Sequence, residues 1–351
     1  MRDTIFEEKL SVFIAVKSRP YEISTYVRGS QKVARCVQTR SKFTMMQGKM
    51  NSARLLITGA SGFVGQQALA RWPQAAALST AHGEIDIRDK SALLTYFSAN
   101  MPETVLHLAA ISFVPDSFKA PEATFEVNFL GTLRLLEALA ESGFRGRFLF
   151  VSSGDAYGTV PVESLPIRET TPLHPRNPYA VSKIAAEALC YQWSQTGPFE
   201  TIVARPFNHI GAGQAPTFAI ADFARQIAEI KVGKRAPVLD VGNIDVTRDF
   251  TDVCDVLHAY ELLMACGHSG EIYNVCSGVE RSVRPLIERL LELSGAEAEI
   301  RIDPARFRPS EQPRVWGSHE KLSQHTGWQP AVPIDETLLN LYRYWEREIG
   351  N

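Results

Sequence analysis

Cysteine is scarce in this sequence. Its 351 residues include five cysteines, none of which forms a CxxC pair or stands beside histidine at a metal-ligating spacing. Their odd number in a long chain disfavours a disulfide framework. We therefore expect no metal site, and free thiols in the cytoplasm. The five residues are Cys36, Cys190, Cys254, Cys266 and Cys276.

Signals for membrane insertion and for nucleic-acid binding are also lacking. No apolar stretch approaches the roughly 20 residues of a membrane-spanning helix. The apolar run at 12–16 is too short for the core of a signal peptide. With 37 Lys and Arg against 39 Asp and Glu, the net charge is −2. No overall field attracts such a chain to nucleic acid or to an anionic membrane, so we expect neither as a partner.

The charges that are present divide the chain into a basic leader and an acidic body. Residues 1–50 contain ten Lys and Arg against four Asp and Glu, whereas the other 301 residues contain 27 against 35. The leader shows no sustained period of 2 or 3.6, and Met50 stands just before the first clear strand. We predict that 1–50 is a basic extension that is disordered or not native, translated upstream of a later start. A basic targeting or interaction arm is the alternative.

From Arg54 onward, short apolar strands alternate with helices. With 45% hydrophobic and 22% charged residues, the body has an ordinary globular composition. The alternation predicts an α/β fold with a doubly wound parallel sheet covered on both faces, over 51–205. After Pro206 the pattern loosens into a smaller, partly interleaved α/β lobe over 206–351, with segment 253–278 returning to the first domain. The expected strands are 54–58, 75–79, 104–110, 147–152, 200–204 and 272–276. The expected helices are 66–72, 91–100, 125–139, 180–195, 219–231, 253–266, 284–293 and 334–348.

Three glycines, Gly59, Gly62 and Gly65, lie between the first strand and the first helix. The first allows a tight turn, the second lets the backbone approach a pyrophosphate, and the third lets the helix pack on the sheet. Asp86 follows about 20 residues later. It could contact the adenine of a dinucleotide or cap the helix near Ser91, and we expect the cofactor contact. The sheet is therefore expected to be of the Rossmann type.

Tyr179 and Lys183 stand four residues apart, which places both side chains on one helix face. A phenol titrates near pH 10, and a neighbouring ammonium lowers that pKa. Ser152 and Ser153 end a strand whose carboxyl edge is where such sheets bind ligands. The three residue types predict a site in which serine holds a substrate oxygen while tyrosine exchanges its proton.

These motifs resemble the extended short-chain dehydrogenase/reductase family of nucleotide-sugar enzymes, over about 54–347. The resemblance rests on TGASGFVG (58–65), HLAA (107–110), VSSGDAYG (151–158), YAVSK (179–183) and RPFNHIGAGQ (205–214). It implies that Tyr179 is the acid–base residue, that Lys183 binds the nicotinamide ribose and tunes Tyr179, and that Ser153 holds the reacting oxygen. It makes 51–205 an NAD(P)-binding domain, and it implies a homodimer that associates through 124–141 and 180–196. Further cofactor contacts that it implies are Ser61, Phe63, Val64, Ile87, Leu108, Ala109, Ala110, Asn128 and Pro206, and further substrate contacts are Ser112, Asp155 and Asn208.

The second half of the chain looks like the GDP-mannose branch of this family. Its supports are VGNIDVTRDFTDVCDV (241–256), YNVCSG (273–278), RPSEQPRVWGS (308–318) and KLSQHTGWQP (321–330). The resemblance implies that Arg248 and Arg308 bind a diphosphate and that Glu311 lies near the nucleoside. Arginine forks suit phosphate oxygens.

Within this branch we expect a reductase of the C4 ketone of a GDP-4-keto-6-deoxy-hexose, which forms a GDP-6-deoxy-hexose of the GDP-D-rhamnose type. Related 4,6-dehydratases carry a glutamate directly after the catalytic Thr or Ser. Here Gly154 offers no side chain, and Asp155 is one methylene shorter than glutamate. A GDP-mannose 4,6-dehydratase and a nucleotide-sugar 4-epimerase remain alternatives. A non-catalytic dinucleotide sensor, the alternative outside enzymes, would be expected to lose the tyrosine or the lysine.

The choice between NADP(H) and NAD(H) depends on the residues that follow the second strand. An acidic residue there favours NAD, and an arginine favours NADP. Residues 78–82 supply neither, which leaves room for a 2′-phosphate with Arg54, Thr80 or His82 as partners. We favour NADP(H), because a reductase must exchange its cofactor at each turnover.

Overall fold

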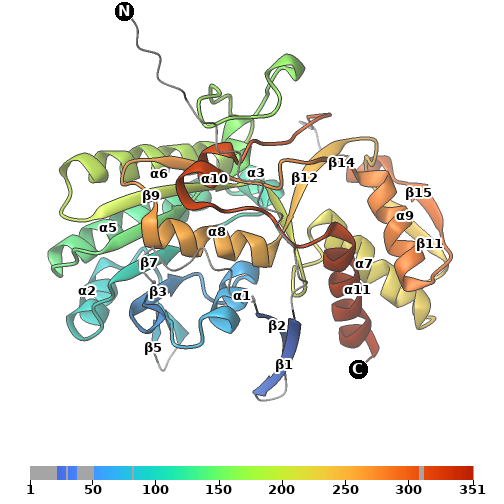
Figure 1. The fold of residues 1–351 in the computed structure, drawn as a ribbon, viewed down its shortest axis with the longest axis horizontal. Coiled ribbons are helices and arrows are strands. Elements are labelled where there is room, and N and C mark those ends of the chain that lie inside the picture. The colour runs from blue at the N-terminus through green and yellow to red at the C-terminus, as the bar shows by residue number, and fades with distance from the viewer. Residues whose placement is uncertain (1–21, 29–30, 38–50, 81–82, 308–311, 351) are drawn as a thin grey trace, which may run out of the picture.

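A six-stranded parallel sheet forms the centre of the first domain in the computed structural model (Figure 1). The structure describes residues 22–28, 31–37, 51–80, 83–307 and 312–350. The strand order is β13-β9-β8-β7-β3-β4, and each neighbouring pair is parallel. This sheet confirms the predicted doubly wound α/β fold. Its strands are β3 (Leu55–Thr58), β4 (Ala76–Ala77), β7 (Thr104–His107), β8 (Arg147–Val151), β9 (Glu200–Pro206) and β13 (Ile272–Val275).

Helices cover both faces of the sheet because its strands are apolar on both sides. In β3, Leu55 and Ile57 pack into one hydrophobic cluster and Leu56 into the other, as the alternation of side chains along a strand requires. The first cluster also contains residues of α1 (Phe63–Arg71), α8 (Val253–Cys266) and α10 (Glu320–Thr326). The second contains residues of α2 (Lys90–Ala99), α5 (Thr132–Glu141) and α6 (Pro178–Thr196).

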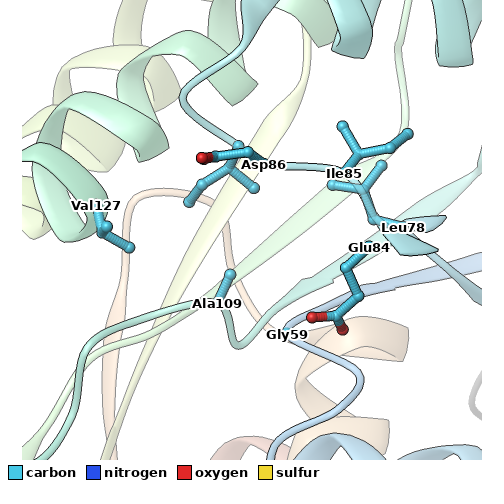
Figure 2. A pocket seen from close by; sticks show the side chains of 8 residues that line it. Gly59, Leu78, Glu84, Ile85, Asp86, Ala109 and Val127 are labelled. Carbon is cyan, nitrogen blue, oxygen red and sulfur yellow. The ribbon is translucent and has the colours of Figure 1, made fainter. Parts of the chain in front are cut away.

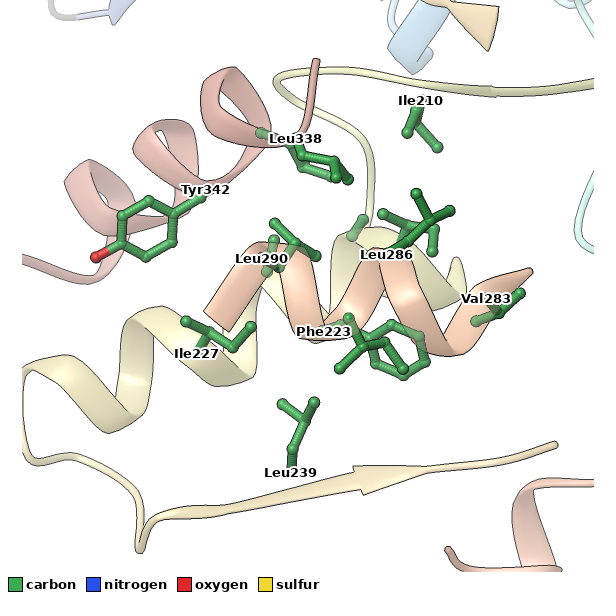
Figure 3. Packing of buried hydrophobic residues seen from close by; sticks show 14 of the residues in the cluster. Ile210, Phe223, Ile227, Leu239, Val283, Leu286, Leu290, Leu338 and Tyr342 are labelled. Atoms are coloured by element: carbon green, nitrogen blue, oxygen red, sulfur yellow. The ribbon is translucent and has the colours of Figure 1, made fainter. Parts of the chain in front are cut away.

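A second lobe packs helices over the strand that carries Leu239 (Figure 3). Phe223, Leu286 and Leu338 come from three different helices and lie in one buried cluster. This lobe therefore has a hydrophobic core of its own. Its elements are α7 (Ala219–Lys231), β11 (Val238–Val241), α9 (Val283–Ser294), β15 (Glu299–Ile302) and α11 (Ile334–Gly350), with β11 and β15 parallel.

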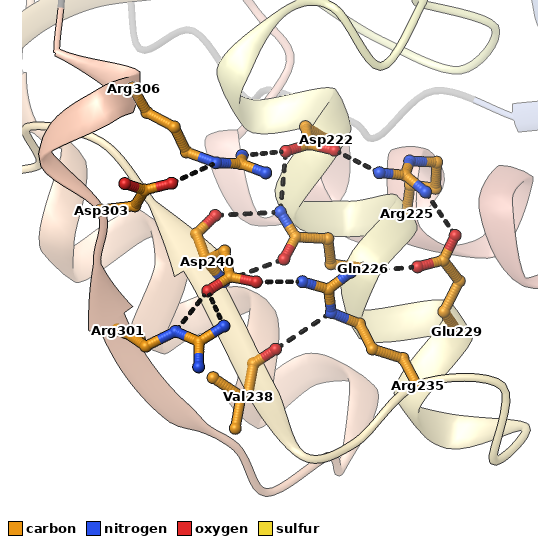
Figure 4. Close-up of polar contacts among 10 residues, drawn as sticks. All are labelled: Asp222, Arg225, Gln226, Glu229, Arg235, Val238, Asp240, Arg301, Asp303 and Arg306. Atoms are coloured by element: carbon orange, nitrogen blue, oxygen red, sulfur yellow. Dashed lines mark hydrogen bonds and ion pairs between the residues drawn. The ribbon is translucent and has the colours of Figure 1, made fainter.

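Ion pairs connect the polar side chains of this lobe (Figure 4). Asp240 of β11 accepts hydrogen bonds from Arg235 at 2.5 Å and from Arg301 at 2.6 Å. Asp222 of α7 accepts one from Arg306 at 2.9 Å. These contacts hold β15 itself, through Arg301, and the chain that follows it, through Arg306.

Short elements join the two lobes at the carboxyl edge of the central sheet. A three-stranded sheet has the order β10-β12-β14, with β10 (Asn208–Ile210), β12 (Thr247–Asp252) and β14 (Glu280–Ser282). The remaining elements are β5 (Ser79–Thr80), β6 (Gly83–Glu84), α3 (Val114–Lys119), α4 (Pro121–Phe125), the π-helix η3 (Glu126–Gly131), and the 3₁₀-helices η2 (Ser52–Arg54), η4 (Gly154–Tyr157), η5 (Val162–Ser164) and η6 (Pro304–Arg306).

The leader contains a hairpin that the sequence pattern did not predict. Strand β1 (Glu22–Arg28) pairs antiparallel with β2 (Gln31–Val37). The division into an extension, a cofactor domain and a substrate lobe stays a prediction. Among the residues described, no helix is long and apolar enough to cross a membrane.

Candidate active site

The glycine turn after β3 has the geometry that its sequence indicates. Gly59 has φ +67°, and a Cβ built on it would lie 2.7 Å from the Ala109 nitrogen. A Cβ on Gly65 would lie 2.3 Å from the Gly59 oxygen, so the helix packs against the turn without room for a side chain. At Gly62 such an atom would meet only the Gly59 oxygen, at 3.3 Å. The middle glycine therefore faces open space at the N-terminus of α1, where an anion fits.

A pocket of about 220 Å³ opens beside this turn (Figure 2). Four predicted cofactor residues line it, namely Gly59, Asp86, Ile87 and Ala109. The other lining residues are Leu78, Glu84, Ile85 and Val127. The pocket is apolar on its walls and carries two carboxylates at its edge, which suits the adenosine half of a dinucleotide.

Asp86 pairs with Arg88 and does not cap the following helix. The Arg88 Nε lies 3.0 Å from both carboxylate oxygens, and this pairing holds the pKa of Asp86 below its usual range. The N-cap of α2 is Asp89, whose side chain accepts from the Ala92 nitrogen. The cap near Ser91 that we considered for Asp86 is therefore wrong by three residues. Asp86 lines the pocket, so its contact with the cofactor stays a prediction.

Glu84 is a residue that sequence reasoning missed at this turn. Its carboxylate accepts hydrogen bonds from the Ser61 N–H and from the Ser61 hydroxyl, each at 2.9 Å. The sequence signal for Glu84 was its acidic side chain. We searched residues 78–82 for an acidic residue, and Glu84 lies just beyond that range. Arg54, which we considered as a partner for a 2′-phosphate, lies at the opposite end of β3 and pairs with Glu103 at 3.1 Å. That assignment is wrong. Of the other two candidates, His82 lies outside the described residues, and nothing is described of the Thr80 side chain.

Helix α6 begins with the predicted catalytic tyrosine. Asn177 caps the helix by accepting from the Ala180 nitrogen at 2.7 Å, and Pro178 occupies the first helical position. Tyr179 is 8% exposed, and the Ser153 side chain lies beside its phenol, where it partly offsets the rise in the Tyr179 pKa. The structure thus brings the end of β8 and the start of α6 together.

Lys183 lies one helical turn further along and is almost fully buried. Its Nζ donates to the Val151 carbonyl at 2.8 Å and lies 6.0 Å from the centre of the Tyr179 ring. Burial lowers the pKa of Lys183 to about 8, and the negative charge of Glu187 partly offsets this. Lys183 is therefore mostly an ammonium at neutral pH.

The pKa of Tyr179 moves in the direction opposite to our expectation. Burial raises it, and the nearby Asp155 carboxylate raises it further, while the hydrogen bond from Ser153 lowers it in part. We had expected Lys183 to lower this pKa. Burial is the largest cause of this rise, so Tyr179 stands as a protonated phenol ready to donate.

Asn128 lies in the π-helix and turns inward. Its Oδ1 accepts from the Ile111 nitrogen at 2.8 Å, and its Nδ2 donates to the Ile111 oxygen and to the Ser182 hydroxyl, both at 3.0 Å. It is fully buried, so it fixes the chain after β7 against α6. A π-helical turn at such a place is typical of functional sites. In this structure Asn128 holds the backbone that borders the pocket.

Three of the predicted substrate residues lie at the surface of the protein. Ser112, Asp155 and Asn208 are exposed, and Pro206 ends β9. Arg248 of β12 donates to the carbonyls of Thr247 and Gln312 at 2.7 and 2.8 Å. Arg308 and Glu311 lie outside the described residues.

Asp249, beside Arg248, is a second residue that sequence reasoning missed. It is fully buried and accepts from the nitrogens of Ser277, Gly278 and Gly317. It thereby fixes two segments, 277–278 and the one at Gly317, next to the predicted diphosphate site. Nothing in the described part of the chain gathers three His, Cys, Asp or Glu side chains as a metal site would.

Known proteins resemble the chain over nearly the whole of its body. The family model described as GDP-mannose 4,6 dehydratase matches residues 67–341. A GDP-6-deoxy-D-mannose reductase of Pseudomonas aeruginosa is 49% identical over 300 residues, which cover 84% of this chain and 98% of that protein. A GDP-mannose 4,6-dehydratase of Yersinia enterocolitica is 29% identical and covers 72% of this chain and 75% of its own length.

Solved structures agree with these matches. RMD from Pseudomonas aeruginosa complexed with NADPH superposes with a TM-score of 0.79 at 47% identity, over 84% of this chain and 99% of that one. A UDP-glucose 4-epimerase of Thermotoga maritima with UDP-glucose superposes with a TM-score of 0.74 at 26% identity, over 84% and 99%. The glycine turn, the Ser–Tyr–Lys site and these matches converge, and the chain belongs to the GDP-mannose 4,6-dehydratase family of the extended short-chain dehydrogenases/reductases.

Proposed function

We propose that this protein reduces the C4 ketone of a GDP-4-keto-6-deoxy-hexose to a GDP-6-deoxy-hexose with NADPH. The observation that carries the proposal is the site itself. Ser153 lies beside the Tyr179 phenol, Lys183 donates to the Val151 carbonyl two residues before Ser153, and no acid stands at position 154. The reductase from Pseudomonas aeruginosa, 49% identical to this chain, supports the same activity.

The residues present fit a dinucleotide. The pocket beside Gly59 takes an adenosine, and the open side of Gly62 takes a pyrophosphate at the N-terminus of α1. Lys183 would hold the nicotinamide ribose. When bound, the cofactor supplies the hydride for C4. We favour NADPH because the 47% identical structural relative was solved with it.

The proton for the reduction comes from the chain's own residues. As C4 is reduced, its carbonyl oxygen becomes a developing alkoxide, which needs a proton and a hydrogen bond. Tyr179 donates its phenol proton to that oxygen, and the Ser153 hydroxyl donates the hydrogen bond. The Lys183 ammonium stabilises the phenolate that this leaves until solvent returns a proton. A phenol whose pKa is raised by burial suits this direction, because it starts out protonated.

The second lobe would hold the GDP moiety. Arg248 lies at the junction of the lobes on β12, and we assign it to the diphosphate, with Arg308 as its partner and Glu311 near the nucleoside. We place the protein in the cytoplasm, and the four cysteines among the described residues, which form no disulfide, support this. We also expect a homodimer through 124–141 and 180–196, supported by Tyr191 of α6, which is 58% exposed.

A dehydratase of the same family is the competing activity, and the local geometry disfavours it. A Cβ on Gly154 would lie 3.3 Å from the Phe207 ring, so an acid at this position would need that buried ring to move. Asp155 is the remaining acid, and it is exposed. We therefore do not assign it as a base for the C5 proton.

Two incubations of the purified protein test this function. With GDP-4-keto-6-deoxy-mannose and NADPH, we expect consumption of NADPH and a GDP-6-deoxy-hexose identified by NMR. With GDP-mannose and NADP, we expect no 4-keto-6-deoxy product. Formation of that ketone would move the assignment to the dehydratase and make Asp155 the first residue to test.

A further inference from the structure

A buried carboxylate continues the line of the two catalytic residues along α6. Tyr179, Lys183 and Glu187 follow one another at intervals of four, so they share one face of the helix. All three are buried, with exposed fractions of 8%, 3% and 4%. A charged pair one helical turn apart in a buried site interacts more strongly than it would at the surface.

Two side chains from the sheet fix the position of Glu187. Arg205 of β9 donates from Nε to Oε1 at 2.8 Å and from Nη2 to Oε2 at 2.5 Å. Ser152, at the end of β8, donates its hydroxyl to Oε1. Both carboxylate oxygens are thus used by the sheet, while the Lys183 Nζ donates to the Val151 carbonyl. Glu187 therefore acts on Lys183 by its charge, through space.

Three of the other ionisable groups around Lys183 are neutral at neutral pH. Burial lowers the pKa of His107 on β7 to about 3, which leaves a neutral imidazole. Burial raises the pKa of Cys190 on the same helix, which leaves a thiol, and Tyr179 remains a phenol. The Asp155 carboxylate on η4 acts on Tyr179, and the Arg205 guanidinium pairs with Glu187. Within this set, Glu187 is the anion that favours an ammonium at Lys183.

We propose that Glu187 is a positioning residue for the reduction: held by Arg205 and Ser152, its carboxylate keeps Lys183 in the charged form beside Tyr179. The proposal rests on the proposed function, because it gives Lys183 the task of stabilising the Tyr179 phenolate and holding the cofactor ribose. A neutral lysine could do neither as well. Glu187 touches neither substrate nor cofactor in this account and acts through Lys183.

The direction in which the pH profile of activity shifts follows from the positive charge of Lys183. Lys183 must be protonated, so activity falls as the pH rises through its pKa of about 8. Removal of the negative charge at 187 lowers that pKa further, so the fall begins at lower pH. A charge one helical turn away shifts the pKa by about one unit, which makes the rate about tenfold lower well above the pKa.

The experiment measures kcat/KM for the GDP-linked ketone from pH 6 to pH 10 in the parent and in Glu187→Gln. We expect the variant to stay within a few-fold of the parent at pH 6 and to lose about tenfold relative to it at pH 9. Glu187→Asp, which keeps the charge, should retain the parental pH profile. Asp240→Asn, which removes an ion-paired carboxylate in the second lobe, should retain it too.

A uniform loss of rate in Glu187→Gln with an unmoved alkaline limb would overturn the proposal, because that is the behaviour of a merely structural ion pair. If the single variant does not fold, Glu187→Gln with Arg205→Gln carries the test. This double variant removes both charges of the buried pair, so neither partner is left as an unpaired ion. An acid shift smaller than that of Glu187→Gln is expected in it, because the Arg205 charge that opposes Glu187 is removed as well.

A second readout separates this proposal from the proposed function. The affinity for NADPH is measured by fluorescence in the absence of any sugar. As the pH rises, this affinity should begin to fall at a lower pH in Glu187→Gln than in the parent. A protein that shows this shift but turns over no GDP-linked ketone would reject the proposed function and support the role of Glu187. A coincident binding profile of parent and variant would reject the role of Glu187, whatever the substrate.

Discussion

Tyr179 is the residue on which the proposed reduction depends most directly. The Tyr179→Phe variant removes only the hydroxyl, so the fold and the cofactor pocket should be retained. Loss of a donor to a developing oxyanion costs roughly 10²–10³ in kcat, and Tyr179 supplies the proton as well. We predict a fall in turnover at least as large as that of Ser153→Ala. Steady-state rates at saturating cofactor and ketone provide the measurement, and a rate within a few-fold of the parent would show that another acid donates the proton.

Glu84 places a fixed negative charge at the turn where the cofactor phosphates should bind. Its carboxylate holds the Ser61 donors, and a 2′-phosphate brings a second negative charge into the same pocket. We predict that Glu84→Gln shifts the ratio of kcat/KM for NADPH over NADH by about fivefold in favour of NADPH, which is the effect of a ~1 kcal/mol contact between charges in water. Asp89→Asn, which lies outside the pocket, is the matched control. An unchanged ratio in Glu84→Gln would remove this residue from cofactor selection.

At the residue scale, the site residues that the sequence could predict were those with a fixed spacing along one helix. The interval of four between Tyr179 and Lys183 survives any helical arrangement, so their shared face was predictable. The raised pKa of Tyr179 and the charge network of Glu187 depend on burial by β8 and β9. Those strands are distant in sequence, so no local pattern carried either feature.

At the scale of single elements, the glycine turn offers a matched pair of substitutions. Gly59 has positive φ and no space for a Cβ, whereas Gly62 borders open space. We predict that Gly59→Ala lowers the free energy of unfolding by about 1–3 kcal/mol. Gly62→Ala should retain the parental Tm but raise the KM for the cofactor. Thermal unfolding and cofactor titration of both variants provide the measurement, and equal effects of the two variants on Tm would contradict the assigned geometry.

Long periodic helices and the apolar strands of the central sheet were predictable, whereas the short strands outside that sheet were not. Helices α7 and α8 have the predicted bounds, 219–231 and 253–266, because their apolar positions recur over three or more turns. The expected helix 125–139 contains a π-helical turn at Glu126–Gly131, which pattern alone does not distinguish from α. Strands β10, β12 and β14 are short and pair across the lobes, so tertiary contacts define them.

At the scale of the whole molecule, the fold signals begin after the leader. The 49% identical reductase matches 84% of this chain and 98% of its own length, so the unmatched part of this chain has no counterpart of similar size in it. We predict that a chain beginning at Met50 folds and retains full kcat/KM. Expression of both lengths with comparison of Tm and turnover checks this. A large loss in the shorter chain would assign the β1–β2 hairpin a role in the fold.

The arrangement of the two lobes was predictable only in part. The doubly wound sheet followed from the alternation of strands and helices, and the structure confirms it. Three contacts join residues 60 or more positions apart. They are Gly317 to Asp249, Arg306 to Asp222 and Arg301 to Asp240. Charged residues in loops give no sequence signal for such pairing, since most are solvated.

The central claim is that hydride reaches C4 while Tyr179 protonates the C4 oxygen. Its most direct test supplies NADPH that carries deuterium at the transferable position of the nicotinamide, together with GDP-4-keto-6-deoxy-mannose. The account predicts a GDP-6-deoxy-hexose with one deuterium, located at C4 by NMR, and almost no labelled product from Tyr179→Phe in the same time. Deuterium at C6, or a reduced product without deuterium, would contradict the account.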